Sequence, residues 1–244
     1  MNQTERYAER LLWSNLIREP AMMAAIQALG LPPGSSGLDA GCGIGLHTVR
    51  LAEAVGSAGY VVGVDVMPEF LALGETRAEQ DGLADRVMFQ EGDIQQLPFE
   101  DDSFDWVWCA DTFHPDPTAS DPYAVLQEFK RVLKPGGMLA LVYWSSQRLL
   151  PGYAALEARL DTAFAVGAPY TNGDDQPDFH LLRGLGWLQA AGFENRTVQT
   201  FVADVYAPLS DDLRRGLTVT FEMLWGWLRD SLYPADWALF QRLC

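Results

Sequence analysis

The sequence is poor in basic residues and has no long apolar run. It contains 17 Lys and Arg residues against 33 Asp and Glu residues in 244, which gives a formal net charge of −16 and a pI near 4.4. Because such a surface repels phosphate backbones and anionic lipids, we expect no nucleic acid as a partner. No run of about 18 apolar residues could span a bilayer, and no signal peptide opens the chain, so we predict no membrane insertion.

Cysteine and histidine are also scarce. Cys42, Cys109 and Cys244 are an odd number at wide spacing, which provides neither a disulfide framework nor a CxxC metal pair. We interpret them as small buried side chains in a reducing compartment and predict a cytoplasmic protein. His47 and His180 have no carboxylates at the spacing of a metal site, so we predict no metal.

Apolar residues make up 48% of the chain, enough for the core of one sizeable domain with insertions. Apolar, β-branched runs bounded by turn residues predict five strands, at residues 37–40, 60–65, 87–90, 104–109 and 138–144. Helical spacing between them predicts helices at 46–55, 68–81 and 123–133. This alternation predicts an α/β fold with a doubly wound, mostly parallel sheet that binds ligands at the carboxyl ends of its strands.

Further helices are expected on both sides of this region. An amphipathic helix is predicted over 4–19, and Pro20 is expected to end it and to begin a second helix over 21–29. Later elements are helices at 153–165, 181–191, 210–228 and 237–243, with a sixth strand at 197–205. We therefore predict an N-terminal helical lid (1–30), a central domain (31–206) and a helical C-terminal segment (207–244).

A glycine turn follows the first predicted strand. Gly41, Gly43 and Gly45 let the backbone approach a ligand closely, and the following helix directs its N–H groups and positive dipole end toward that ligand. A nicotinamide dinucleotide is one alternative, but its fingerprint is G-x-G-x-x-G. The acid before the turn, Asp39, would also repel a pyrophosphate, whereas it suits a cationic ligand.

Four further motifs follow this turn in order. They are Val-Gly-Val-Asp at 62–65, Gly-Asp-Ile at 92–94 with Leu-Pro-Phe at 97–99, Phe-Asp-Trp-Val at 104–107 and Leu-Lys-Pro-Gly-Gly at 133–137. Together with the turn, they resemble the class I S-adenosylmethionine-dependent methyltransferases, in particular the ubiquinone and menaquinone biosynthesis type. The resemblance covers residues 20–145, with a weaker continuation to 205. It implies a Rossmann-like methyltransferase fold, S-adenosylmethionine as cofactor and S-adenosylhomocysteine as product.

The resemblance also implies a set of cofactor-binding residues. Asp65 corresponds to the acid that accepts hydrogen bonds from the ribose hydroxyls, and Asp93 with Ile94 to the pair that meets the adenine. For each acid a structural alternative stays open: Asp65 could cap a helix, and Asp93 and Asp111 could form turns. The full predicted set is Asp39, Gly41, Cys42, Gly43, Gly45, Asp65, Val66, Met67, Asp93, Ile94, Asp111 and Tyr7.

The predicted chemistry is an in-line methyl transfer that depends mainly on proximity. His114, after the fourth strand, is the candidate base if the acceptor must lose a proton; a loop histidine without a catalytic role is the alternative. Tyr143, Trp144 and Trp13 are predicted on the acceptor side. Tyr7 and Trp13 belong to the predicted lid, with core packing as the alternative.

A small organic acceptor is the predicted substrate. The segment after the fourth strand lacks the Pro-Pro-aromatic motif of amino-methylating DNA enzymes and the glutamate pair of arginine methyltransferases. Residues 221–228 are expected to wall an acceptor pocket, to form helix core or to form a homodimer surface. A second hypothesis is a non-catalytic S-adenosylmethionine-binding module. Because no seventh strand follows the sixth, we expect either a fragment or a sheet that ends early.

Overall fold

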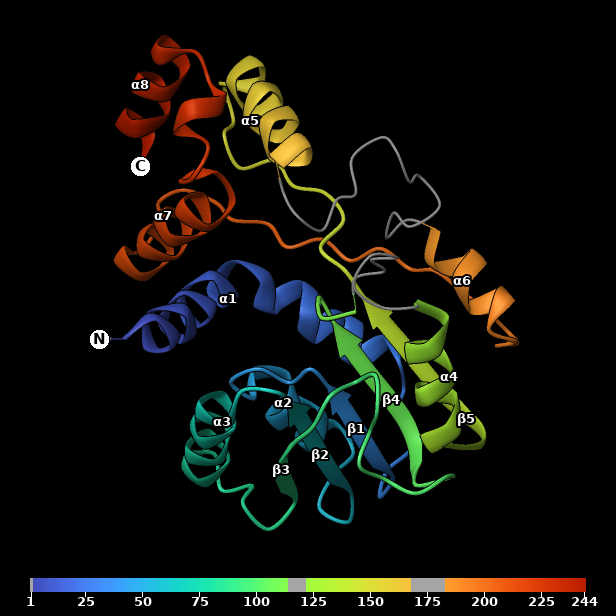
Figure 1. Cartoon of the computed structure of the whole chain (residues 1–244). Coiled ribbons are helices and arrows are strands. Elements are labelled where there is room, and N and C mark those ends of the chain that lie inside the picture. Colours follow the sequence, from blue (N-terminus) through green and yellow to red (C-terminus); the bar gives the residue numbers. More distant parts are fainter. Residues whose placement is uncertain (1, 114–121, 168–182) are drawn as a thin grey trace. The chain divides into compact units, whose positions relative to one another are not determined.

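The structure is a computed structural model that describes residues 2–113, 122–167 and 183–244 (Figure 1). The chain divides into two compact units. The sheet unit comprises the described residues of 20–143 and 181–202, and the helical unit comprises those of 1–19, 144–180 and 203–244. The division at residues 30 and 206 that the sequence suggests stays a prediction.

The sheet unit contains five parallel strands in the order β3-β2-β1-β4-β5 (Figure 1). They are β1 (Ser36–Ala40), β2 (Tyr60–Asp65), β3 (Val87–Glu91), β4 (Phe104–Ala110) and β5 (Leu133–Val142). Helices α2 (Leu46–Ala54), α3 (Pro68–Gln80) and α4 (Pro122–Val132) connect them, and α6 (Gly184–Ala190) follows. This confirms the predicted doubly wound fold. The strand order reverses between β1 and β4, so the glycine turn after β1 lies where such sheets bind ligands.

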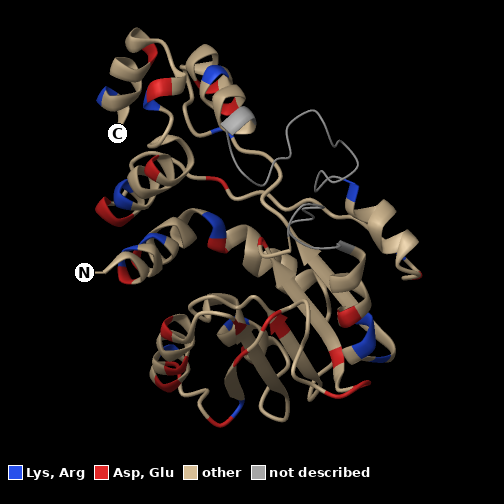
Figure 2. Cartoon of the chain, viewed as in Figure 1, with Lys and Arg blue, Asp and Glu red and all other residues tan. Residues whose placement is uncertain are grey.

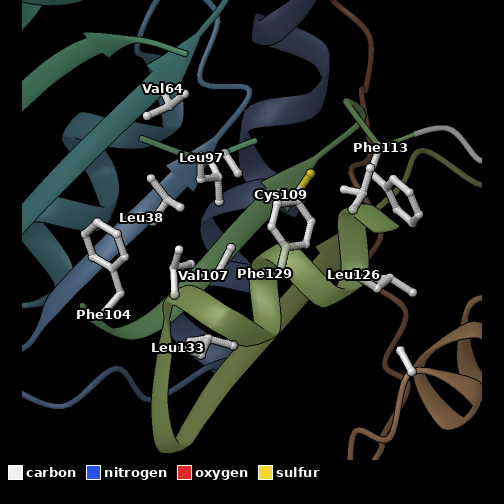
Figure 3. Close-up of a cluster of buried hydrophobic side chains, with 14 of the residues drawn as sticks. Leu38, Val64, Leu97, Phe104, Val107, Cys109, Phe113, Leu126, Phe129 and Leu133 are labelled. Atoms are coloured by element: carbon white, nitrogen blue, oxygen red, sulfur yellow. The ribbon is translucent and has the colours of Figure 1, made fainter. Parts of the chain in front are cut away.

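Strand β4 shows why both faces of the sheet are covered. Trp106 and Trp108 belong to one hydrophobic cluster, with α2 and the second half of α1 (Gln3–Ala28), whereas Val107 and Cys109 belong to the other, with α4. Figure 3 shows Val107 and Cys109 beside Phe129 of α4. Alternate residues of a strand point to opposite faces, and each large buried side chain stabilises the unit by about 1.5–3 kcal/mol.

Helix α1 (Gln3–Ala28) corrects the prediction that Pro20 ends a helix. The helix continues through Pro20, which coincides with the boundary between the two units. A proline removes one helical hydrogen bond and clashes with the preceding turn. Ile17, Ala21 and Met22 on either side are all buried, and this packing outweighs that loss.

The helical unit has a hydrophobic core of its own. It is formed by α5 (Ala154–Gly167), α7 (Asp211–Trp225) and α8 (Pro234–Leu243), with Leu228 and Leu232 on either side of the short 3-10 helix η3 (Arg229–Ser231). The Trp225 ring is fully buried between Phe221 and Phe240, at centroid distances of 5.7 and 6.0 Å. Of the three alternatives for residues 221–228, helix core is therefore the one seen for Phe221, Trp225 and Leu228.

The predicted sixth strand is wrong. Residues 197–205 form no strand, and β5 is the last strand in the described part of the chain. Val198 and Val202, whose β-branched side chains suggested a strand, are 69% and 70% exposed. A strand without a neighbour cannot form a ladder, and the strands of the described residues pair only with one another, in the order β3-β2-β1-β4-β5.

Acidic residues outnumber basic ones on the structure, as they do in the sequence. On α3, Glu69, Glu75 and Glu79 outnumber the single Arg77, and acidic residues are spread over both units (Figure 2). Within residues 2–113, 122–167 and 183–244, no helix combines the length and hydropathy that crossing a membrane requires.

Candidate cofactor site

The glycine turn joins β1 to α2 in a left-handed backbone conformation. Gly41, Gly43 and Gly45 have φ values of +79°, +52° and +75°, a region that residues with a Cβ rarely adopt. The N–H groups of Gly41 and Cys42 both donate to the Val64 carbonyl of β2, at 2.8 Å. The turn is therefore fixed to the neighbouring strand and is not a free loop.

Asp65 at the end of β2 fixes the crest of this turn. Its Oδ2 accepts a hydrogen bond from the Gly43 N–H at 2.8 Å, and its Oδ1 accepts one from the Met67 N–H at 3.0 Å. An ionised carboxylate has about four lone-pair sites, so two backbone donors leave capacity for two hydroxyl donors. The side chain is partly exposed and can reach both the turn and a bound diol.

Two glycines of the turn are also required by close packing. A Cβ on Gly45 would lie 2.8 Å from the Phe89 ring and 2.9 Å from the Gly74 backbone of α3. A Cβ on Gly41 would lie 2.1 Å from the Thr112 side chain, whose hydroxyl donates to the Gly41 carbonyl at 3.1 Å. The turn is thus held between β2, α3 and the end of β4.

Asp39 lies beneath the turn. Its side chain is buried, with 1% of the residue exposed, and its Oδ2 accepts a hydrogen bond from the Thr48 hydroxyl at 2.6 Å. Burial raises the pKa of Asp39 to about 7; the Thr48 hydrogen bond opposes this rise, and the nearby Asp65 carboxylate adds to it. That Asp39 favours a cationic ligand stays a prediction. The carboxylate would do so through its negative charge.

Asp39→Asn should change how stability depends on pH. The unfolded Asp39 has a pKa near the usual ~3.9, so between about pH 4 and 7 the unfolded chain releases a proton that the folded chain retains. This group therefore lowers the free energy of unfolding as pH rises, by up to about 1.4 kcal/mol per unit. The Asn variant lacks this contribution. The free energy of unfolding of the Asn variant minus that of wild type should therefore increase as the pH rises from 5 to 7.5. Urea unfolding of the ligand-free proteins measures this difference.

The matched control for that measurement is Glu79→Gln, which neutralises an exposed carboxylate on α3. Its stability relative to wild type should hardly change between the two pH values. If Asp39→Asn also shows the same stability difference from wild type at pH 5 and at pH 7.5, Asp39 does not titrate in this range.

The other predicted cofactor residues lie on the same edge of the sheet. Asp93 is exposed, and its Oδ1 accepts from the Gln95 N–H at 2.9 Å, so the turn expected as the alternative is present. Ile94 packs partly against the core, whereas Val66 is 58% exposed beside Asp65. These positions leave the adenine assignment a prediction.

The end of β4 is firmly anchored. Asp111 has a φ of +50°, and its N–H donates to the Val142 carbonyl of β5 at 2.9 Å. Phe113 is buried against Phe129 and Trp187, and its carbonyl accepts a hydrogen bond from the Tyr143 hydroxyl at 2.7 Å. Burial raises the pKa of Tyr143, so this phenol stays a donor. The predicted base, His114, lies outside the described residues.

Tyr7, Trp13 and Trp144 belong to the helical unit. The Arg215 guanidinium lies 4.0 Å from the centroid of the Trp13 ring, and the Arg18 guanidinium lies 5.1 Å from that of Trp144. Such cation–π contacts stabilise a fold by about 0.5–2 kcal/mol. Trp13 is partly buried and belongs to none of the hydrophobic clusters of the described residues, so its core packing and the lid and acceptor assignments for Tyr7, Trp13 and Trp144 stay predictions.

Two residues that shape the turn, Thr48 and Thr112, are not among the residues that the sequence motifs predict. Thr48 lies three positions after Gly45, the N-cap residue of α2, and its partner Asp39 is nine residues away in β1, so no helix-capping pattern indicates it. Thr112 contacts Gly41 across 71 residues, and no local pattern indicates this. Among the described residues, no group of three His, Cys, Asp or Glu side chains is arranged to hold a metal.

The arrangement fits an adenosine ligand with a cationic tail. A partly exposed carboxylate for a diol, a turn whose backbone comes to the surface and a buried second carboxylate lie at one edge of the sheet. This combination of parallel sheet, glycine turn and strand-end acids is consistent with a Rossmann-like methyltransferase fold.

Comparison with known proteins agrees with this class. Residues 38–137 match the family model described as a methyltransferase domain. A demethylmenaquinone methyltransferase of Staphylococcus aureus is 38% identical over 130 residues, 53% of this chain and 51% of that protein. A sterol 24-C-methyltransferase of Gibberella zeae is 29% identical over 192 residues, 76% of this chain and 48% of that protein.

A solved structure extends the agreement to three dimensions. A SAM dependent methyltransferase from Aquifex aeolicus has a TM-score of 0.56 and 25% identity, covering 74% of this chain and 84% of that one. Residues 38–137 thus match a methyltransferase domain, and the agreement with a solved SAM dependent methyltransferase supports S-adenosylmethionine as the cofactor. The chain spans about half the length of the curated relatives it matches.

Proposed function

We propose that this protein transfers the methyl group of S-adenosylmethionine to a small organic acceptor. The observation that supports it best is Asp65, which holds the glycine turn through Gly43 and keeps acceptor capacity for two ribose hydroxyls. The methyltransferase relatives named above support it independently.

The cofactor supplies a methyl group already activated on a sulfonium, so the chain mainly has to position the two reactants. Asp65 and the turn would bind the nucleoside, and Asp39 would favour the positive end through its charge. Holding nucleophile and methyl in line can supply most of the rate enhancement. In this proposal the N-terminal helical segment, residues 1–30 with Tyr7 and Trp13 among them, excludes water as a lid.

Labelled methyl transfer is the test. The two relatives are named for a sterol and for demethylmenaquinone, which are both apolar, so we propose an apolar acceptor and a panel that includes these two compounds. Transfer of radiolabel from S-adenosylmethionine to one member of the panel is the expected result. Micromolar cofactor binding with no transfer to any acceptor would favour the non-catalytic binding module instead.

His114 is the proposed base for acceptors that must lose a proton. Phe113, the residue before it, is buried in the core, and its carbonyl accepts a hydrogen bond from the Tyr143 hydroxyl. These contacts fix the position of Phe113. His114→Gln should lower kcat at least about tenfold at neutral pH and leave the cofactor dissociation constant unchanged. A kcat equal to that of wild type across pH 6–9 would exclude the base.

The remaining assignments belong to the same proposal. We propose that the protein acts in the cytoplasm, and sedimentation velocity with and without cofactor will establish whether it forms a homodimer. In the same proposal Tyr143 and Trp144 face the acceptor. Exchanging either residue for alanine should therefore raise the KM for the acceptor more than the KM for the cofactor.

A further inference from the structure

Thr48 connects the first strand to the helix behind the glycine turn. It lies in the first turn of α2, is fully buried, and donates its hydroxyl hydrogen to Asp39 Oδ2 at 2.6 Å. A hydroxyl-to-carboxylate hydrogen bond this short is charge-assisted and stronger than a neutral one. Both ends are inaccessible to water, so neither group can replace its partner with solvent.

This hydrogen bond encloses the whole turn. Asp39 and Thr48 are nine residues apart, and the segment between them contains all three left-handed glycines. The N-cap residue of α2, Gly45, provides no side-chain cap, so the contact to Asp39 is what ties the first helical turn to β1. The turn therefore has one carboxylate anchor at its base, Asp39, and one at its crest, Asp65.

The charged surroundings of Asp39 explain why this hydroxyl matters. The groups that face it are Asp65 from β2, Cys42 in the turn and Cys109 from β4, with His47 of α2 lying against the Trp108 ring. Burial opposes the ionisation of Asp39 and the Asp65 carboxylate adds to this, whereas the Thr48 hydroxyl favours ionisation. A cation brought to the turn would favour the ionised form further.

We propose that Thr48 is a positioning residue for the cofactor: its hydroxyl holds the base of the glycine turn in place and keeps Asp39 ionised when the cationic cofactor binds. The inference rests on the proposed function, because it assumes that S-adenosylmethionine binds at this turn. It adds a residue that acts without touching the ligand.

The test compares Thr48→Val, which has the same shape without the hydroxyl, with Thr48→Ser, which keeps it. Calorimetry with S-adenosylmethionine from pH 5.5 to 8.5 should show wild-type affinity rising with pH toward a plateau, because binding favours ionised Asp39. In Thr48→Val the affinity should fall about tenfold at pH 7, and the rise should shift to higher pH. Thr48→Ser should restore both.

Three outcomes would overturn the inference. They are wild-type affinity with a wild-type pH profile in Thr48→Val, a weakened affinity with an unshifted profile, and no rescue by Thr48→Ser. If Thr48→Val does not fold, Asp39→Asn decides: its affinity should not depend on pH in this range, and a persisting wild-type profile contradicts the inference. If wild type binds neither S-adenosylmethionine nor S-adenosylhomocysteine, the proposed function itself fails.

Discussion

Replacing Asp65 with alanine should weaken binding of S-adenosylmethionine by about 100-fold or more. The carboxylate accepts hydrogen bonds from Gly43 and Met67 and, in the proposed complex, from two ribose hydroxyls. Hydrogen bonds to a charged group contribute about 1.5–3 kcal/mol each, and every 1.4 kcal/mol is tenfold in affinity. The loss of the ribose contacts alone therefore accounts for the expected effect.

Titration calorimetry measures this loss of affinity, and two further variants serve as comparisons. Asp65→Asn keeps the size and one acceptor oxygen, so it should lie between wild type and Asp65→Ala. Glu79→Ala removes an exposed carboxylate on α3 and should leave the dissociation constant unchanged, which separates contact from net charge. A dissociation constant in Asp65→Ala within threefold of wild type would exclude ribose binding by this residue.

Exchanging Gly45 for alanine should both destabilise the sheet unit and prevent measurable cofactor binding. The positive φ of +75° costs a non-glycine residue about 1–2 kcal/mol. The added Cβ would also lie 2.8 Å from the Phe89 ring and 2.9 Å from the Gly74 backbone, and helix backbone cannot move aside as a flexible side chain can. Overpacking adds about 1–3 kcal/mol, so we expect a total loss of about 2–5 kcal/mol.

Gly56→Ala is the matched control for this prediction. Gly56 has a φ of +74°, yet nothing lies within 4 Å of the position of its Cβ. The free energy of unfolding of Gly56→Ala should therefore fall only by the cost of the positive φ, about 1–2 kcal/mol in urea unfolding. The variant should bind the cofactor like wild type. Equal losses of stability in the two variants would mean that the contacts with Phe89 and Gly74 relax without cost.

The sequence predicts the sheet unit well because its signals are local. Strand β2 is found at the predicted residues, 60–65, since the apolar, β-branched run that follows Gly59 is a local strand signal. The glycine turn is likewise encoded in adjacent residues. Gly41 also reflects a distant contact, because it packs against Thr112, which lies far away in the chain.

Predictions fail where distant contacts decide the outcome. Pro20 predicts a helix end from its own chemistry, but the burial of residues on both sides of it keeps α1 continuous. Val198 and Val202 favour a strand, yet a strand also needs a neighbour with free hydrogen-bonding groups. The turn at Asp93, which propensity allowed as an alternative, is formed by its own side chain and is therefore predictable.

The three anchors of the glycine turn also imply an order of assembly during synthesis. They join residues 9, 22 and 71 positions apart: Thr48 to Asp39, Gly43 to Asp65 and Thr112 to Gly41. Contacts between distant residues form later because the intervening chain must first be made and its ends brought together. We therefore expect the turn to close first on its own helix and to become fully fixed only when β4 joins the sheet, so that cofactor binding by a growing chain reports the completion of β4.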